Sequence, residues 1–247
     1  MAVITWNKQY GETLKDTLER FRKSHPEYLN SKITYAGRLD PMAEGLLILL
    51  TDQDVHKKES YLKLDKTYRV EFILGVTTDT YDILGLITDT QAATMDEEIV
   101  NASINNLVNI VEQEYPPYSS KTVLGKPLWQ HQREGSIDAI VVPSRKVTIS
   151  SVRTTNQQEI TAHEFKTMIF DAIQRVKGDF RQEEILKSWE EYFTNCPQLF
   201  TLYTIEIDAS SGTYMRGLIN TLGKTLGGGA TTVKITRKRI GTYTQDN

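Results

Sequence analysis

Hydrophobic residues along the chain are grouped in lengths typical of strands, with amphipathic segments between them. Residues 46–50 (LLILL) form a continuous apolar run that is too short for a membrane span and has the length of a strand buried on both faces. Residues 66–74 (KTYRVEFIL) alternate apolar and polar side chains, as a strand does. Further strands are predicted at residues 2–6, 141–152, 202–207 and 235–241.

Helices are predicted where apolar residues recur every three or four positions. Residues 14–22 place Leu14, Leu18 and Phe21 on one face, and Thr13 or Asp16 could cap this helix. The other predicted helices cover residues 53–62, 96–111, 164–176 and 182–193.

The pattern changes to charged helices between residues 154 and 200. We interpret this segment as a helical insertion before the final strand pair. Trp189, Tyr192 and Phe193 are the side chains expected to hold the insertion to the rest of the protein.

A polar turn places one carboxylate directly before the apolar run. Gly37 can adopt a backbone conformation that costs other residues energy, Pro41 fixes its own φ, and the residue before a proline avoids helical angles. Asp40 therefore lies in a turn. A carboxylate anchored beside a core is costly to desolvate unless a cation or hydrogen-bond donors meet it. Asp40 could only cap the turn, with Arg38 as a solvated neighbour, or it could carry chemistry.

Composition limits the class of protein. The 247 residues suffice for one large domain, or one domain with an insertion. A single cysteine, Cys196, excludes an internal disulfide framework and fits a reducing compartment. No secretory signal pattern and no run of about 18 apolar residues occurs, so we expect no membrane span and a cytoplasmic protein.

The net charge of −3 argues against nucleic-acid binding over the whole surface, but positive charge is clustered. One cluster lies in residues 57–69, with Lys57, Lys58, Lys63, Lys66 and Arg69, and the other is the segment Lys234–Arg239, KITRKR. A basic face on an acidic protein could bind RNA. Alternatively, these side chains protect solvated strand edges.

Metal and phosphate sites have little support in the sequence. Asp79 and Asp82 are oxygen ligands close together, but they lack the ligand density and the terminal Glu of a calcium loop. The four histidines, including His131, are not spaced with cysteine or carboxylates as zinc ligands. Gly227–Gly229 lacks the spacing of a phosphate-binding loop. We therefore expect no metal site.

Five ordered motifs resemble the TruB family of RNA pseudouridine synthases. The turn at residues 37–45 (GRLDPMAEG) is similar to the family's G-x-L-D-P-x-x-x-G, and residues 75–85 (GVTTDTYDILG) contain its T-D-T-x-D-x-x-G. The other motifs are WNKQYGET at residues 6–13, EYPPYSSKTVLGKPLWQHQREG at 114–135 and SSGTYMRGLINTLG at 210–223. In the last of these motifs, Thr213 can cap a helix. The last predicted strand, ITRKRIG, resembles the family's L-R-R-T-R-V-G. Two residues at the N-terminal motif depart from the family pattern. Gln9 stands where the family has proline, and Leu14, directly after WNKQYGET, stands where it has serine.

This resemblance implies a mixed α/β (α+β) fold, with a central, largely antiparallel sheet flanked by helices. It also implies isomerisation of a uridine in RNA to pseudouridine without a cofactor. Asp40 would act either as a nucleophile at C1′ or as a base at C2′. Arg216 would hold it in a charge-assisted bidentate pair, and Tyr68 would stack on the target base. The expected RNA contacts are Tyr35, Arg38, Lys8, Asp82, Lys121, Arg133, Arg237 and Arg239.

The target uridine must leave its base stack before it can react. The resemblance indicates the T-arm uridine of transfer RNA, position 55, and we expect a monomer with one catalytic domain over residues 1–247 and no C-terminal PUA-type domain. Tyr35 occupies the place of a family histidine, which leaves another target open, such as ribosomal RNA. A silent RNA-binding module would lack Asp40 or Arg216. A glycoside hydrolase would need a second carboxylate with motif support.

Overall fold

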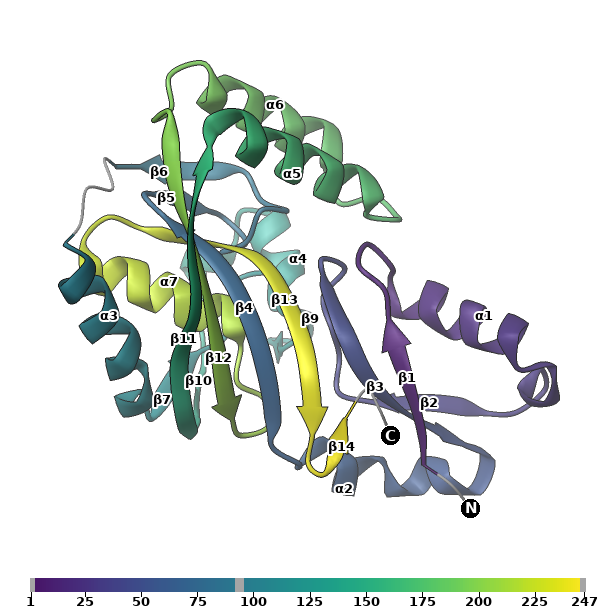
Figure 1. The fold of residues 1–247 in the computed structure, drawn as a ribbon. Coiled ribbons are helices and arrows are strands. Elements are labelled where there is room, and N and C mark those ends of the chain that lie inside the picture. The colour runs from purple at the N-terminus through teal and green to yellow at the C-terminus, as the bar shows by residue number, and fades with distance from the viewer. Residues whose placement is uncertain (1–2, 92–95, 245–247) are drawn as a thin grey trace.

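The computed structural model describes residues 3–91 and 96–244. Within these ranges an eight-stranded sheet forms the centre of the molecule, in the order β1-β3-β13-β4-β12-β11, with β2 paired to β3 and β14 to β13 (Figure 1). Its strands are β1 (Ile4–Lys8), β2 (Ile33–Ala36), β3 (Ala43–Thr51), β4 (Lys66–Leu74), β11 (Ile149–Thr161), β12 (Leu199–Ala209), β13 (Ala230–Ile240) and β14 (Tyr243–Thr244). The described strands pair antiparallel except β3 with β13, which confirms the predicted largely antiparallel sheet.

Helices and short strand pairs surround this sheet. The α-helices are α1 (Leu14–Ser24), α2 (Lys58–Leu62), α3 (Glu97–Asn105), α4 (Leu128–Arg133), α5 (Ala162–Arg175), α6 (Gln182–Phe193) and α7 (Met215–Leu226). The short strand pairs are β5 (Val76–Thr78) with β6 (Ile87–Thr90), β7 (Glu112–Glu114) with β10 (Ser144–Lys146), and β8 (Thr122–Val123) with β9 (Lys126–Pro127). The 3-10 helices are η1 (Pro26–Tyr28), η2 (Asp52–Lys57), η3 (Asn106–Asn109) and η4 (Ile137–Ala139).

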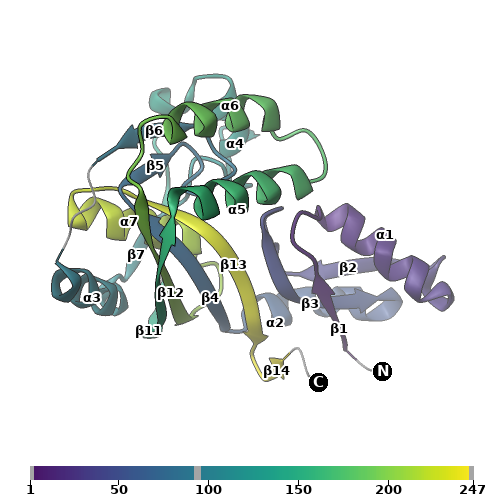
Figure 2. The ribbon, with the colours of Figure 1, turned by 45° about the horizontal axis from the view of Figure 1, so that its top comes forward.

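The helices occupy distinct places around the sheet. α7 packs on β13 and β4, and α3 lies beside α7 and the edge strand β11. α5 and α6 lie side by side at one end of the central strands, at the top of Figures 1 and 2. No helix in the described ranges has the length and apolar character needed to cross a bilayer.

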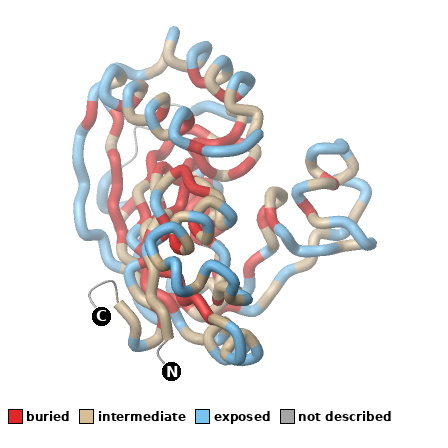
Figure 3. Tube along the Cα trace, turned by 90° about the vertical axis from the view of Figure 1, so that its right-hand side faces the viewer, coloured by how far each residue is buried: buried red, intermediate tan, exposed pale blue. Residues whose placement is uncertain are grey.

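The apolar run in β3 is buried on both of its faces, as predicted. Leu47 and Leu49 belong to the core that α7 covers, whereas Leu46, Ile48 and Leu50 pack in a second cluster. Figure 3 shows buried residues concentrated on the central strands and exposed residues along the outer faces of the helices. The strand directly after Asp40 is therefore fixed from two sides.

Capping was predicted correctly for the first helix and wrongly for the last. The Thr13 hydroxyl accepts a hydrogen bond from the Asp16 N–H at 3.2 Å, and the Asp16 carboxylate accepts from the Thr13 N–H at 2.9 Å. Thr213, expected to cap α7, is not its N-cap. That position is Tyr214, whose N–H donates to Gln113 Oε1 at 2.8 Å.

The segment after residue 140 differs from its prediction in two places. β11 continues to Thr161 and pairs with β12, so residues 154–161 are a strand and the helical part begins at Ala162. The strand predicted at 141–152 divides into β10, which pairs with β7, and the start of β11. α5 and α6 confirm the two predicted helices within this segment.

Trp189 anchors the α5–α6 hairpin to the rest of the protein. Its side chain is fully buried, and Nε1 donates to the carbonyl oxygen of Ile83 at 3.1 Å. It shares one apolar cluster with Ile83, Phe165 and Met42. Because Met42 lies two residues after Asp40, the hairpin packs directly beside the loop that carries Asp40.

Candidate active site

The loop between β2 and β3 carries Asp40, and a buried lysine holds this loop in shape. Lys8 is 0% exposed, and its Nζ donates to the carbonyl oxygens of Pro41 at 3.1 Å and Ala43 at 2.5 Å. Burial lowers the pKa of Lys8 to about 8, against the opposing effect of the Asp40 carboxylate. Lys8 thus supports the loop from within, which corrects the expectation that it contacts RNA.

Arg237 supports the same loop from β13. Its Nε donates to the carbonyl oxygen of Leu46 at 2.7 Å, and its terminal amino groups donate to those of Arg38 at 3.2 Å and Gly37 at 3.3 Å. With 1% of its surface exposed, Arg237 is a buried structural cation. Arg237 also lines the 380 Å³ cavity described below, so its predicted contact with RNA stays a prediction, although three of its donors are already taken by backbone carbonyls.

Arg216 reaches Asp40 from the first turn of α7. Its Nε donates to Asp40 Oδ2 at 2.8 Å, whereas its terminal amino groups donate to the carbonyl oxygens of Thr80 at 2.7 Å and Tyr118 at 3.3 Å. The predicted meeting of Arg216 and Asp40 is confirmed. The predicted bidentate geometry is wrong, because backbone carbonyls take the other donors of the guanidinium.

Asp82 is a second carboxylate beside Arg216, and it is buried. Its Oδ2 lies 3.4 Å from Arg216 Nε, and its Oδ1 accepts from the Thr80 hydroxyl at 2.7 Å and the Leu84 N–H at 2.9 Å. Burial raises the pKa of Asp82 to about 6, although Arg216 opposes this. Burial also lowers the pKa of Arg216, but the Asp40 and Asp82 carboxylates outweigh it and the net shift is upward. Asp82 stabilises the buried arginine and also lines the 350 Å³ cavity described below, so its predicted contact with RNA stays a prediction.

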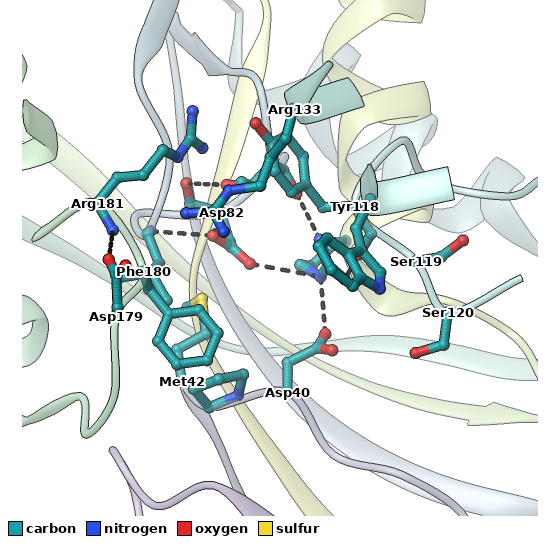
Figure 4. Close-up of a pocket in the computed structure, with 15 residues that line it drawn as sticks. Asp40, Met42, Asp82, Tyr118, Ser119, Ser120, Arg133, Asp179, Phe180 and Arg181 are labelled. Carbon is teal, nitrogen blue, oxygen red and sulfur yellow. Dashed lines mark hydrogen bonds and ion pairs between the residues drawn. The ribbon is translucent and has the colours of Figure 1, made fainter. Parts of the chain in front are cut away.

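Two cavities meet at the Asp40–Arg216 pair. The first, of about 380 Å³, is named here the Tyr68 cavity, and the second, of about 350 Å³, the Phe180 cavity (Figure 4). Asp40, Tyr118, Ser119, Ser120 and Arg216 line both cavities. The Asp40 side chain is 41% exposed, so a molecule in the cavities can reach its carboxylate.

The Tyr68 cavity combines an aromatic ring with cations. Tyr68 lies on β4, 8% exposed, and lines this cavity together with Lys66 and Ile235. Lys66 donates to the carbonyl oxygen of Leu62 at 2.8 Å, and burial, followed by the charge of Arg237, lowers the pKa of Lys66 to about 8. A planar base fits the chemistry of this cavity, because a tyrosine ring offers a stacking face next to a carboxylate.

The Phe180 cavity has a wall that the sequence did not predict. Asp179, Phe180 and Arg181 come from the connection between α5 and α6 and line the cavity together with Trp129 and Met42. Figure 4 shows Met42 beside Phe180. The sequence predicted both helices but not the direction in which their connection points. The change of helical pattern near residue 180 marked a turn, but no local signal linked that turn to Asp40.

Besides Asp82 and Arg237, three predicted RNA contacts lie at or beside the cavities. Arg38 is exposed, lines the Tyr68 cavity and donates to the Ser120 hydroxyl at 2.5 Å. Arg133 is exposed and lines the Phe180 cavity. Lys121 is exposed next to Ser120, with Nζ 5.3 Å from the centroid of the Tyr115 ring. Each of these cations is open to a ligand.

The two remaining predicted contacts line neither cavity. Tyr35, on β2, packs against the main core, and Lys58 Nζ lies 5.5 Å from its ring centroid. Arg239 is paired with Asp208 at 2.8 Å and also donates to the Thr67 hydroxyl at 2.9 Å. The charge of Arg239 is thus largely neutralised by a carboxylate of the protein itself.

Among the residues that the structure describes, no group of three metal-ligating side chains is brought together. Asp79 and Asp82, the candidate oxygen ligands, have separate partners. Asp79 pairs with Arg181 at 2.9 Å, and Asp82 faces Arg216. The two carboxylates therefore stabilise different parts of the cavity wall.

Comparisons with known proteins show the family of this chain. Residues 26–183 match the family model described as TruB family pseudouridylate synthase (N terminal domain). The tRNA pseudouridine synthase B of Thermotoga petrophila is 29% identical over 243 residues, covering 98% of this chain and 64% of that protein. The same-named protein of Vibrio vulnificus is 28% identical over 248 residues, covering 100% of this chain and 64% of that protein. This chain thus spans 64% of the length of these two relatives.

Solved structures share the fold at lower sequence identity. A chain from the crystal structure of a Cbf5-Nop10-Gar1 complex matches with a TM-score of 0.59 at 16% identity, over 99% of this chain and 50% of that one. A chain from the structure of an H/ACA RNP bound to a substrate RNA containing 2′-deoxyuridine matches with a TM-score of 0.53 at 16% identity. This match covers 99% of this chain and 49% of that one. With the family model matching more than half of its residues, the chain belongs to the TruB family of pseudouridylate synthases.

Proposed function

We propose that this protein isomerises a uridine in RNA to pseudouridine, and that its substrate is the T-arm uridine of transfer RNA. The observation that carries the proposal is the position of the Asp40 carboxylate. The Asp40 side chain is 41% exposed where the two cavities meet, and it accepts a hydrogen bond from the buried Arg216. Arg216 engages Oδ2. Within the described ranges, Oδ1 has no hydrogen-bond partner, so it is available to a substrate.

The reaction rearranges atoms within one nucleotide and needs no second substrate. The N1–C1′ bond breaks, the uracil rotates, a C5–C1′ bond forms, and the proton leaves C5 while N1 gains one. Asp40 either attacks C1′, forming an ester bond that breaks when C5 bonds to C1′, or removes the proton from C2′ and returns it when the C5–C1′ bond forms. In both cases the fixed bond from Arg216 orients the carboxylate toward the sugar, and Tyr68 provides a stacking face for the base.

The relatives and the surface chemistry support an RNA substrate. The two curated relatives carry the name tRNA pseudouridine synthase B, and one solved structure of the same fold contains a substrate RNA. The cavities accept one nucleotide only if it leaves the helical stack. Arg38 and Arg133, exposed at the cavities, are placed to meet the backbone phosphates of such a nucleotide.

The test compares the parent and Asp40→Asn on three RNAs. Unmodified transfer RNA transcript, an isolated T-arm stem-loop and a ribosomal RNA fragment are incubated with each protein, and pseudouridine is located by carbodiimide labelling and primer extension. We expect a new stop at the T-arm uridine with the parent alone. A stop only in the ribosomal fragment would contradict the T-arm assignment. Binding without any modification would identify an RNA-binding module instead.

A further inference from the structure

Arg181 joins three separate segments of the chain beside the active site. Its side chain, 17% exposed, extends from the α5–α6 connection and places Nη2 2.9 Å from Asp79 Oδ2. Its guanidinium carbon lies 4.9 Å from the centroid of the Tyr118 ring. The Tyr118 hydroxyl donates to the same Asp79 oxygen at 3.0 Å. These contacts form a closed clamp of cation, carboxylate and aromatic ring.

The clamp holds the two backbone segments that Arg216 uses. Thr80 directly follows Asp79, and its carbonyl oxygen accepts from Arg216 Nη1 at 2.7 Å. The carbonyl oxygen of Tyr118 accepts from Arg216 Nη2 at 3.3 Å. A shift of either segment would remove an acceptor from the guanidinium and rotate the Nε–H that points at Asp40.

The α5–α6 connection is built to keep Arg181 in place. The Phe180 N–H donates to Gln182 Oε1 at 2.8 Å, and Gln182 Nε2 donates to the carbonyl oxygens of Val176 at 3.1 Å and Gly178 at 2.7 Å. Arg181 itself has a φ of 63°, in the left-handed region that non-glycine residues rarely adopt. Such a conformation persists when the surrounding bonds determine it.

We propose that Arg181 is a positioning residue for the isomerisation, so that the α5–α6 hairpin completes the active site rather than only adding surface. This inference rests on the function proposed above. Arg181 acts through Asp79 and Tyr118 on the guanidinium that orients the Asp40 carboxylate. Since a misplacement of about 1 Å in an active site can cost roughly a hundredfold in rate, loss of the clamp should slow the chemical step.

The kinetic test separates positioning from RNA binding. Single-turnover rates on the T-arm stem-loop at saturating enzyme, and the enzyme concentration at half saturation, are measured for the parent and for Arg181→Ala, Arg181→Lys and Tyr118→Phe. We expect Arg181→Ala to lower the saturating rate about ten- to a hundredfold with little change in half saturation. Arg181→Lys should recover part of the rate, because an ammonium can still pair with Asp79. Tyr118→Phe keeps the ring and loses one hydrogen bond, so a smaller loss is expected.

The control is Lys187→Ala. Lys187 is exposed on α6 of the same hairpin, so this variant should have the saturating rate and the half saturation of the parent. An unchanged saturating rate in Arg181→Ala would overturn the inference. So would a change confined to half saturation, because that outcome would make Arg181 an RNA contact. The thermal midpoint shows whether Arg181→Ala folds. If it does not, the saturating rates and half-saturation concentrations of Arg181→Lys and Tyr118→Phe still test the inference.

A second readout does not depend on activity. The Nε–H signal of Arg216 is assigned in a nitrogen-15 spectrum by its absence from Arg216→Lys, and then compared between the parent and Arg181→Ala. A changed signal is expected if the clamp positions Arg216. An unchanged signal would overturn the inference whether or not RNA is modified. A changed signal together with a parent that modifies no RNA would overturn only the proposed function.

Discussion

The Nε of Arg216 lies 2.8 Å from Oδ2 of Asp40, although the two residues are 176 positions apart in the sequence. The arginine side chain is 4% exposed and the aspartate side chain 41%. This charge-assisted hydrogen bond therefore has one end in the core and the other at the cavities. A fixed buried donor can orient the carboxylate while leaving its second oxygen open to substrate.

Arg216→Lys should lower the single-turnover rate about a hundredfold, nearly as much as Arg216→Ala. An ammonium has no planar fork, so it cannot serve Asp40 and the carbonyls of Thr80 and Tyr118 from one place. Rates on the T-arm stem-loop at saturating enzyme measure this. Arg153→Lys, on the exposed edge strand β11, is the matched control and should keep the parent rate. Parent-like turnover by Arg216→Lys would show that the three-way bonding is dispensable.

Arg237→Ala should lower the free energy of unfolding by about 3 kcal/mol, because it leaves the carbonyl oxygens of Gly37 and Arg38, in the loop that carries Asp40, and of Leu46, in β3, without its donors. The neighbouring Lys238 is exposed, so Lys238→Ala should change stability by less than about 0.5 kcal/mol. Urea denaturation of both variants provides the comparison. Equal stabilities would mean that Arg237 does not support the loop.

Asp82 should give the protein a distinct dependence of stability on pH. Its folded pKa of about 6 lies above the ordinary aspartate value of about 3.9, so the folded state holds this proton more tightly than the unfolded chain. The resulting contribution to stability is fully present below about pH 4 and is lost as pH rises through about 6, on the order of 3 kcal/mol in total.

Asp82→Asn cannot titrate at this position and should lack that loss. Unfolding free energies of the parent and the variant, measured between about pH 4 and pH 7, should show the variant gaining relative to the parent as pH rises. Parallel curves would contradict a raised pKa for Asp82.

Arg133→Ala should weaken binding to the T-arm stem-loop and reduce the slope of log affinity against log salt by about one. Arg133 is exposed at the Phe180 cavity and is therefore placed for a phosphate contact. Lys187→Ala, which lines neither cavity, is the control of matched exposure. Equal slopes for the parent and Arg133→Ala would remove Arg133 from the RNA-binding surface.

Local patterns in the sequence predicted the elements that present the site. The alternation in residues 66–74 gave β4 its observed bounds, and the apolar run gave a strand buried on both faces. The approach of Arg216 to Asp40 was predicted from motif resemblance, because periodicity says nothing about two positions so far apart. The number of bonds between them was not predictable, since it depends on which carbonyls reach the guanidinium.

A local signal in the KITRKR segment indicated that Arg237 is buried. In β13, Val233, Ile235 and Arg237 are buried at alternate positions, as the side-chain period of a strand requires. This alternation, which can be read from the sequence, predicts that Arg237 lies on the core face of the strand. The wall formed by Asp179, Phe180 and Arg181 had no such signal, because the direction of a turn between two helices follows from their packing.

The central claim is that Asp40 is the catalytic carboxylate. The most direct test is the saturating single-turnover rate of Asp40→Asn on a T-arm stem-loop, with folding checked by its thermal midpoint. The amide keeps the shape of the side chain but can neither attack C1′ nor accept the C2′ proton. We predict a loss of at least about a thousandfold, corresponding to about 4 kcal/mol of transition-state stabilisation, in a folded protein. A folded Asp40→Asn that retains a tenth or more of the parent rate would contradict the claim.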